Sequence, residues 1–535
     1  MCPLDARGTV RGALRSETAP GSRERVAAYT PPLTLLNLQR KGLPVLSVIA
    51  AASDPLQVDA DLLAVPVFKG GIEGPGAGPV LDALGLDDFP VTPCFRGDIG
   101  QHFLLASPGL SAAGVLLVGL GRMDATDPER LRHAAGVAAQ ACRRVERVAT
   151  TLAGVHANRA AVEAITEGFH LGAYTDRRFK AAADGAEVPR LAEVTLLVPS
   201  SLLGDARAGI ARATVYARAT CAARDLVNLP PDRKRPEDLV AAIRRLVAGV
   251  CDVTVRDEDA LAEQGFGGLL AVGRGSSAPP RLAELRYRPP APIAHVVLVG
   301  KGVTFDAGGL SLRRGTDLET QKKDMAGAAV VAAAMSVLAD LDVRLAVTGL
   351  LALAENVPGA DAQRPGDVVT IHGGTTVEVR DTDAEGQLVL ADALDYATTL
   401  RPQTIIDVAT LTGTSAALGR YAGALMGNDD DLVDELRAAA LVVGEHLWPL
   451  PLWPELDRFL DTPVADLTNT GDGAGGGTIM EGLFLKRFVG DCPWAHLDIT
   501  GPAFLSPDLA TGHLPPGATG FGVRTLLAWL ERRTA

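Results

Sequence analysis

The chain has 535 residues, enough for two domains that each bury a core, and 47% of them are hydrophobic, as in a globular protein. The formal net charge of -13 argues against nonspecific affinity for nucleic acid or for an anionic membrane, so neither is expected as a partner. No uninterrupted apolar run of about 18 residues occurs, and no membrane span is predicted.

Residues 1–40 are predicted to be a disordered extension. The stretch Met1–Arg25 mixes Arg, Ser, Gly and Pro and lacks the apolar core of a signal peptide, so a start codon assigned too early is the alternative. The six cysteines are scattered and include no C-x-x-C pair, a distribution typical of reduced thiols in a cytoplasmic protein.

Residues 41–205 alternate between strand-like and helical stretches, which predicts an N-terminal α/β domain with a largely parallel sheet. The expected elements are strands at Val45–Ile49, Leu62–Val67, Gly114–Gly119 and Val194–Val198 and a helix at Pro128–Val148. Residues 206–235 are predicted to connect two domains, because a helical pattern over Ala206–Arg224 is stopped by Pro230 and Pro231.

Residues 236–535 are predicted to form a larger α/β domain with a mostly parallel central sheet flanked by helices. The expected elements are helices at Pro236–Val250 and Met325–Ala339 and strands at Val253–Val255, Ala294–Val299, Arg344–Leu353 and Thr404–Ala409. The stretch Ala294–Val299 is apolar throughout, as in a strand buried on both faces of a parallel sheet, and ligand sites lie at the carboxyl edge of such sheets.

One lysine and four acids lie at or near the ends of predicted strands and helices. Lys301 and Asp306 come after a predicted strand, Asp324 opens a helix, and Asp383 and Glu385 lie two apart, so that on an extended chain they share a face. Several buried acids cannot all ionise without compensating cations. Bound divalent metal is the simplest compensation, with oxygen ligands and one neutral amine suiting Zn or Mn. The weaker alternative is a set of capping acids and a surface lysine.

The sequence resembles the leucyl aminopeptidase (cytosol aminopeptidase) family of dinuclear metallopeptidases. The resemblance is carried by the segments Val299–Gly309 and Asp381–Gln387 and by Asp324, eighteen residues after Asp306. The resemblance covers roughly the C-terminal three hundred residues. It continues through Asp407–Gly413, Trp494–Asp498 and Gly517–Gly520.

The resemblance implies two divalent ions per subunit, Mn or Zn, which activate a water against peptides with a free N-terminus. Its implied metal ligands are Lys301, Asp306, Asp324, Asp383 and Glu385, and its implied substrate-binding residues are Thr410, Leu411, Thr412 and Gly413. It also implies a macro-like N-terminal domain and a homo-hexamer. DNA binding, which the resemblance also allows, is the weakest hypothesis because the chain is acidic.

Three positions depart from the family pattern. Arg313 stands where the family has a catalytic lysine, and Gln387 where it has an arginine that holds bicarbonate. A neutral amide cannot hold bicarbonate as a guanidinium does. Asp381 replaces an asparagine. The chain is therefore predicted to release N-terminal residues of the leucine type, with activity that these changes can reduce; the alternative is a catalytically inactive member that binds metal and peptide in a structural or regulatory role.

Overall fold

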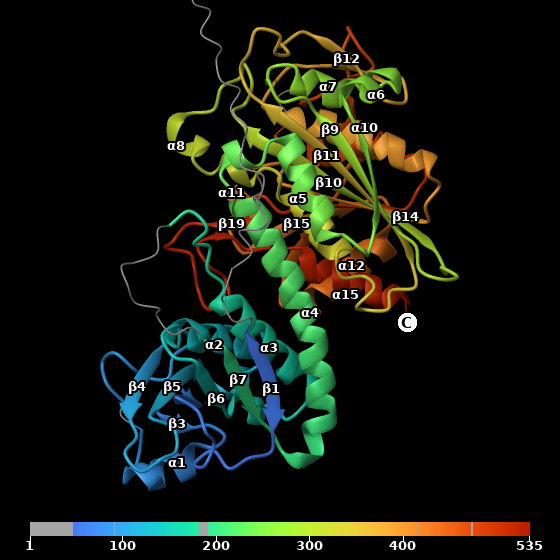
Figure 1. The fold of residues 1–535 in the computed structure, drawn as a ribbon. Helices are drawn as coiled ribbons and strands as arrows, with labels where there is room; N and C mark the ends of the chain where they lie inside the picture. Colours follow the sequence, from blue (N-terminus) through green and yellow to red (C-terminus); the bar gives the residue numbers. More distant parts are fainter. Residues whose placement is uncertain (1–45, 90, 181–190, 414, 472–474, 535) are drawn as a thin grey trace, which may run out of the picture.

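The computed structural model contains two lobes, each built on an open sheet, with the long helix α4 (Leu203–Asn228) running from one into the other (Figure 1). It describes residues 46–89, 91–180, 191–413, 415–471 and 475–534. The extension expected at residues 1–40 lies outside these ranges. Within them, no helix is both long enough and apolar enough to cross a membrane.

The N-terminal sheet is parallel from β1 to β5 and antiparallel at β4 and β3. In spatial order its strands are β1 (Ser47–Ala51), β7 (Glu193–Leu197), β6 (Arg147–Thr150), β2 (Leu62–Phe68), β5 (Gly114–Gly121) and β4 (His102–Ala106), with β3 (Ile72–Glu73) beside β2. Helices α1 (Ala77–Leu84), α2 (Pro128–Ala141) and α3 (Arg159–Ala173) pack on this sheet.

The helix expected over Pro128–Val148 is too long. Asp127 caps its start by accepting a hydrogen bond from the Arg130 backbone N at 2.8 Å, but the helix ends at Ala141. Residues after the turn form the buried strand β6, because their apolar side chains find a place between β2 and β7. The sequence stays rich in Ala and Arg through the turn, so its pattern did not indicate where the helix ends and the strand begins.

Helix α4 belongs to both cores. Ala206 and Ile210 pack in the N-terminal core, whereas Tyr216 and Ala223 pack in the core of the second lobe. Arg224 is fully buried where the lobes meet. Its guanidinium donates to the backbone oxygens of Leu171 at 2.9 Å, His513 at 2.9 Å and Thr519 at 2.8 Å, which ties the two lobes together.

The second lobe contains a sheet whose four central strands, β18, β14, β10 and β11, run parallel. In spatial order the sheet is β16 (His446–Pro449), β15 (Ala422–Gly427), β18 (Trp494–Asp498), β14 (Thr404–Ala409), β10 (His295–Asp306), β11 (Ala346–Asn356), β9 (Arg281–Tyr287) and β8 (Asp252–Arg256). Strands β8 and β9 are antiparallel to their neighbours, and β15 is antiparallel to β18.

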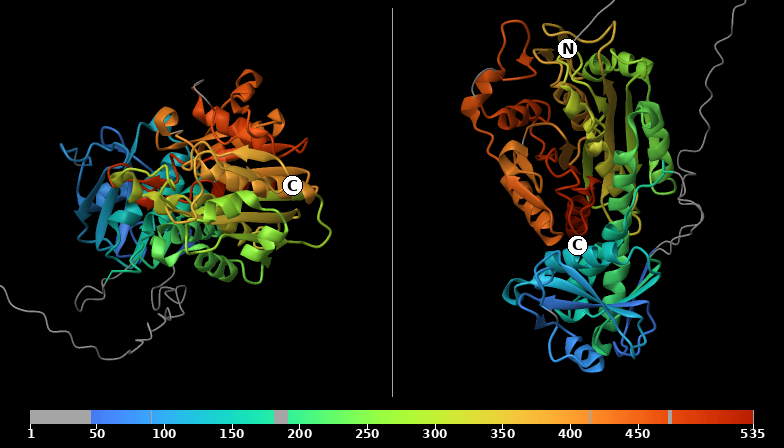
Figure 2. Two further views of the ribbon diagram at one scale, coloured as in Figure 1. Left: turned by 90° about the horizontal axis from the view of Figure 1, so that it is seen from above. Right: turned by 90° about the vertical axis from the view of Figure 1, so that its left-hand side faces the viewer.

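Helices cover both faces of this sheet (Figure 2). One face carries α4, α5 (Pro236–Leu246), α9 (Ala326–Met335), α12 (Asp430–Val442) and α15 (Val523–Thr534). The other carries α6 (Glu258–Glu263), α7 (Gly267–Gly273), α10 (Glu385–Thr399) and α14 (Gly477–Lys486). Short strands form two further small sheets, with β12 (Val368–Thr370), β13 (Thr376–Glu378) and β17 (Leu467–Thr468) in one and β19 (Phe504–Leu505) and β20 (Gly517–Ala518) in the other.

Candidate metal centre

The lysine and four acids predicted from the sequence meet at the carboxyl edge of the second sheet. Lys301 and Asp306 lie inside the last part of β10, which is longer than predicted, and do not follow it. Asp383 and Glu385 do not share a strand: Asp383 lies in a turn, and Glu385 is the first residue of α10. Lys301, Asp306, Asp324, Asp383 and Glu385 are called the acid group below.

Asp324 does not cap the helix that it precedes. It lies in the turn between the 3-10 helix Gln321–Lys323 and α9, and the α9 N-cap position, Met325, makes no side-chain capping bond. Instead the Asp324 carboxylate accepts a hydrogen bond from Thr410 Oγ1 at 2.7 Å and contacts Lys301 Nζ at 2.8 Å. The capping alternative is therefore wrong for this acid.

Three carboxylates crowd around one amine. Oxygen atoms of Asp306, Asp324 and Glu385 lie within 4.8 Å of one another. Lys301 Nζ lies 2.9 Å from Glu385 Oε1 and also donates to the backbone oxygen of Thr410 at 2.9 Å. The side chains of these three acids and of Lys301 are at most 5% exposed, so bulk water offers them little charge screening.

Arg313 brings the fourth acid, Asp383, into this arrangement. Its Nη2 lies 2.6 Å from Asp306 Oδ2, and its Nε lies 2.7 Å from Asp383 Oδ1. The Arg313 side chain is 29% exposed, so it forms the solvent-facing edge of the acid group. Gln387, the other substituted position, is buried in the first turn of α10.

The pKa values record an excess of negative charge. Burial, and then the charge of Asp306, raise the pKa of Asp383 to about 7. The same two causes raise the pKa of Glu385 well above its ordinary value, and burial raises the pKa of Asp324. Burial alone would lower the pKa of Lys301, but Asp324 and Glu385 raise it. Without a further cation the group would therefore take up protons near neutral pH.

These residues fit a divalent cation. Asp324 Oδ2, Asp383 Oδ1 and Glu385 Oε1 are buried and accept no well-directed hydrogen bond, although each contacts a cationic side chain. Such oxygens have accepting capacity left over, and the group carries more negative charge than Lys301 balances. Carboxylate oxygens with one nitrogen are a donor set suited to Mn or Zn.

Asn356 is a supporting residue that the sequence analysis missed. It ends β11 directly opposite Asp306, and its Nδ2 donates to Asp306 Oδ1 at 2.9 Å and to the backbone oxygen of Thr382 at 3.0 Å. It therefore fixes the ends of two segments that carry acids. The available signal was its position at the end of the neighbouring apolar strand, where a polar side chain faces the same sheet edge.

Two glycines make room for the group. A Cβ added to Gly386 would lie 2.8 Å from Lys301 Cε and 2.9 Å from Lys301 Nζ. Gly308 has a φ of +85°, and a Cβ there would lie 2.7 Å from Asp383 Oδ1. Any side chain at either position would push an acid-group member away, so the glycines of these two segments serve the site directly.

The loop predicted to bind substrate lies beside the acid group. Thr410 contacts both Lys301 and Asp324, as described above. Thr412 donates its backbone N–H to Asp498 Oδ2 at 3.0 Å, and its Oγ1 lies 2.8 Å from Thr478 Oγ1 at the start of α14. Leu411 is half-buried and Gly413 is exposed. The structure thus places all four residues, Thr410, Leu411, Thr412 and Gly413, along one side of the centre.

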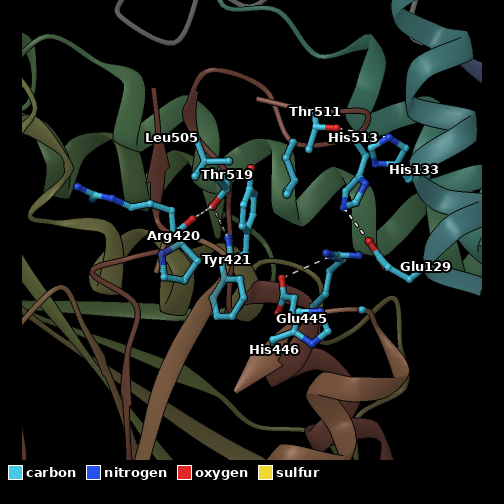
Figure 3. A pocket seen from close by; sticks show the side chains of 15 residues that line it. Glu129, His133, Arg420, Tyr421, Glu445, His446, Leu505, Thr511, His513 and Thr519 are labelled. Carbon is cyan, nitrogen blue, oxygen red and sulfur yellow. Dashed lines mark hydrogen bonds and ion pairs between the residues drawn. The ribbon is translucent and has the colours of Figure 1, made fainter. Parts of the chain in front are cut away.

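A cavity of about 200 Å³ lies elsewhere, between α2 and the segments around Glu445 and Arg524 (Figure 3). Its charged side chains face one another: His513 Nε2 lies 3.5 Å from Glu129 Oε1, and Arg524 Nε lies 3.5 Å from Glu445 Oε1. None of the acid group lines it. This cavity belongs to the contact between the lobes.

The fold and the site together define the class. A lysine and four carboxylates at the edge of an open α/β sheet are a donor set of the kind that metal-dependent hydrolases use. Two family models match the chain: the catalytic domain of the cytosol aminopeptidase family over residues 221–527, and the N-terminal domain of the same family over residues 64–183.

Individual relatives agree with the family models. A probable cytosol aminopeptidase of Nocardia farcinica is 45% identical over 422 residues, 78% of this chain and 82% of the relative. One of Streptomyces griseus is 43% identical over 503 residues, 89% of this chain and 96% of the relative. The chain therefore belongs to the cytosol aminopeptidase family, as its motifs predicted, and it is a metalloaminopeptidase.

Solved structures show the same two-domain architecture. The bottromycin maturation enzyme BotP in complex with Mn has a TM-score of 0.79 and 38% identity, with 89% of this chain and 100% of that chain covered. A mutant of tomato leucine aminopeptidase has a TM-score of 0.80 and 31% identity, with 91% and 97% covered. These matches support the predicted divalent metal cofactor.

Proposed function

We propose that this chain removes the first residue from peptides with a free N-terminus by means of two divalent ions, Mn or Zn, held by the acid group. The observation that carries the proposal is the convergence of these five side chains, with three buried carboxylate oxygens that accept no well-directed hydrogen bond. When bound, such ions lower the pKa of water and polarise the scissile carbonyl.

The chain's own residues would hold this arrangement in place. Asn356 and the Gly308 backbone N–H both donate to Asp306 Oδ1 at 2.9 Å, and Thr410 Oγ1 orients Asp324. Supporting hydrogen bonds of this kind commonly change metal affinity by about 10–100-fold when lost. Lys301 would give up its proton to become a neutral ligand, because the ions replace it as the balancing charge.

Arg313 would serve in place of the lysine that the family resemblance implies. Its guanidinium lies at the open edge of the acid group, where it can donate to the carbonyl oxygen that gains negative charge. The loss of one such donor costs about 10²–10³-fold in rate in well-studied hydrolases. Arg313 would not exchange a proton itself, since neighbouring Asp306 and Asp383 raise its already high pKa.

Gln387 gives no charge with which to hold bicarbonate, so proton transfer would depend on solvent at this position. The remaining proposals follow the family resemblance. We propose a homo-hexamer, which light scattering would show as a particle six times the mass of the 55.5 kDa chain. A cytoplasmic location is supported by relatives named cytosol aminopeptidases.

The test measures metal content and turnover of leucine 4-nitroanilide on one sample. We expect two ions per chain and metal-dependent turnover, with Glu385→Gln losing both. Bound metal without turnover, and turnover that appears only after Arg313→Lys together with Gln387→Arg, would instead support the inactive, metal-binding alternative. Failure to bind any divalent ion would overturn both.

A further inference from the structure

Asp498 is the last residue of strand β18 and lies beside the loop predicted to bind substrate, residues 410–413. Its side chain is fully buried, and β18 pairs with β14 so that Asp498 lies opposite Ala409, the residue before the loop. The backbone N–H of Ile499 donates to the Ala409 oxygen at 2.8 Å and joins the two strand ends. The central sheet, and not the loop, therefore sets the position of this carboxylate.

Three donors share the two carboxylate oxygens of Asp498. The backbone N–H of Thr412 donates to Oδ2 at 3.0 Å. The backbone N–H and the hydroxyl of Thr500 donate to Oδ1 at 2.9 Å and 2.7 Å. All three donors are uncharged groups. One oxygen of the carboxylate therefore holds the loop, while the other holds the chain that continues from β18.

An ionised carboxylate accepts on both of these sides, and an amide of the same shape does not. An asparagine oxygen at position 498 would keep more hydrogen bonds by facing Thr500, which offers two donors. The amide NH2 would then face the N–H of Thr412, donor against donor. A buried N–H without an acceptor is unfavourable, so the loop would shift to find another one. The aspartate therefore fixes where the Thr412 backbone lies.

The bond to Thr412 also sets the direction of the loop backbone. The peptide between Leu411 and Thr412 is trans, so its C=O points opposite to the N–H that Asp498 holds. A rotation of this peptide would redirect both groups together. The surface that the loop offers to a substrate thus depends on a carboxylate that is itself out of a substrate's reach.

The start of the loop is fixed by different partners. Thr410 accepts a hydrogen bond from Lys301 Nζ at 2.9 Å through its backbone oxygen, and its hydroxyl donates to Asp324 at 2.7 Å. The acid group is thus attached to the first residue of the loop, and Asp498 to the third. Moving Thr412 changes the loop beyond the residue that contacts the acid group.

We propose that Asp498 is a positioning residue that holds the backbone of Thr412 in the place where a peptide substrate packs against the loop. Asp498 itself touches neither substrate nor metal. This inference rests on the proposed aminopeptidase function. It separates the control of substrate affinity, by Asp498 through Thr412, from the control of metal affinity by the acid group and Thr410.

The test compares KM and kcat for leucine 4-nitroanilide in the Mn-loaded wild type, Asp498→Asn and Thr500→Val. Asp498→Asn should raise KM by roughly tenfold or more and change kcat less, because it removes an acceptor that holds the substrate loop. Its affinity for Mn should stay within about twofold of the wild type, since the ligands and Thr410 are intact. Thr500→Val, the matched control, removes a donor to the other oxygen of the same carboxylate and should leave KM unchanged.

Asp498→Glu gives a second variant in case the asparagine variant does not fold. It keeps the charge and both acceptor oxygens, but its extra methylene moves them, so it should also raise KM. An unchanged KM in either folded variant would overturn the inference. A fall in kcat with unchanged KM and a lower midpoint of thermal unfolding would show a structural role. A matching loss of Mn affinity, or failure of both variants to fold, would also overturn it.

Binding of free L-leucine separates this inference from the proposed function. If leucine 4-nitroanilide is not turned over, the aminopeptidase proposal fails, but calorimetric titration of the Mn-loaded protein with leucine still measures a dissociation constant. Asp498→Asn should weaken leucine binding by roughly tenfold, and Thr500→Val should not change it. Equal binding by all three proteins would overturn the role of Asp498 independently of turnover. No leucine binding by the wild type would overturn both proposals.

Discussion

Two buried charge clusters of this protein look similar but are balanced differently. The interdomain group, Arg132, Glu129, Glu167, Glu445 and Arg524, has two arginines and three acids, with the partly exposed Glu129 paired to Arg132. Glu167 Oε2 accepts from Arg132 Nε at 2.8 Å and from Arg524 Nη1 at 3.1 Å. Glu445 Oε2 accepts from the Gly522 and Thr525 backbone N–H groups, each at 3.1 Å. The acid group instead sets four carboxylates against one lysine, with Arg313 at its edge.

The difference shows how to separate a structural cluster from a functional one. In the interdomain group every acid finds its partners within the chain, so the cluster is complete and joins two lobes. In the acid group, three buried carboxylate oxygens accept no well-directed hydrogen bond, and three acids have raised pKa values. A buried cluster that does not balance itself is built for a ligand of opposite charge.

The largest expected effect comes from removing one acid of the acid group. Glu385→Gln should lower kcat/KM by about 10³-fold or more, because the divalent ions lose a ligand. The same change should raise the melting temperature of metal-free protein, since it relieves repulsion among the carboxylates. Activity assays test for the loss of kcat/KM, and calorimetry in EDTA tests for the higher melting temperature. A lower melting temperature in EDTA would contradict the charge excess inferred here.

Removing a cation from the interdomain group should act on stability and leave catalysis intact. Arg524→Met leaves Glu167 and Glu445 with fewer partners in a buried setting and should cost about 3–5 kcal/mol of unfolding free energy. Urea denaturation measures this loss. The control is Arg122→Met, which breaks an exposed pair with Asp124 and should leave the urea midpoint nearly unchanged. Similar losses of unfolding free energy in both variants would show that the interdomain group stabilises the fold no more than an exposed ion pair does.

A methyl group at Gly386 tests how tightly the acid group is packed. Gly386→Ala places a Cβ against Lys301 and should displace its amine, weakening Mn binding by about 10–100-fold. Isothermal titration of metal-free protein with Mn measures the change. Gly374→Ala lies where a Cβ has open space, and it should leave Mn affinity unaltered despite the strain of its positive φ. Equal affinities for wild type and Gly386→Ala would mean that Lys301 is not a ligand.

The most gradual effect is a pH dependence. Asp383 has its pKa raised from 3.8 to about 7 in the folded, metal-free chain. The folded state therefore binds more protons than the unfolded state between those values, so this contribution to stability is complete below pH 3.8 and is lost as the pH rises to about 7. The slope is at most about 1.4 kcal/mol per pH unit. The free energies of unfolding measured with Mn and with EDTA should differ more and more as the pH rises across this range. A difference that stays constant with pH would contradict the raised pKa of Asp383.

Much of the centre was predictable from the sequence because its residues lie in short segments at the ends of apolar strands. Thr404–Ala409 forms the predicted strand unchanged, and all five acid-group members meet as expected. Local spacing did not show how they meet. Glu385 turns inward because it begins a helix, not because it shares a strand with Asp383.

Other features could not be predicted because they depend on contacts between distant segments. Asn356 faces Asp306 only because β10 and β11 pair in one particular register. The end of α2 at Ala141 was missed because Ala and Arg continue the helical pattern into the turn. In each case tertiary placement, not local sequence, decides the outcome.

Helix α4 carries a consequence for how the molecule unfolds. Its 26 residues extend for roughly 39 Å as one rigid rod, and its two ends are embedded in different hydrophobic cores. Melting either core would expose apolar side chains of the shared rod and separate the buried guanidinium of Arg224 from one or two of its three backbone acceptors. The two lobes should therefore lose their structure in a single cooperative step, so that a destabilising change in the N-terminal lobe also destabilises the acid group in the other lobe.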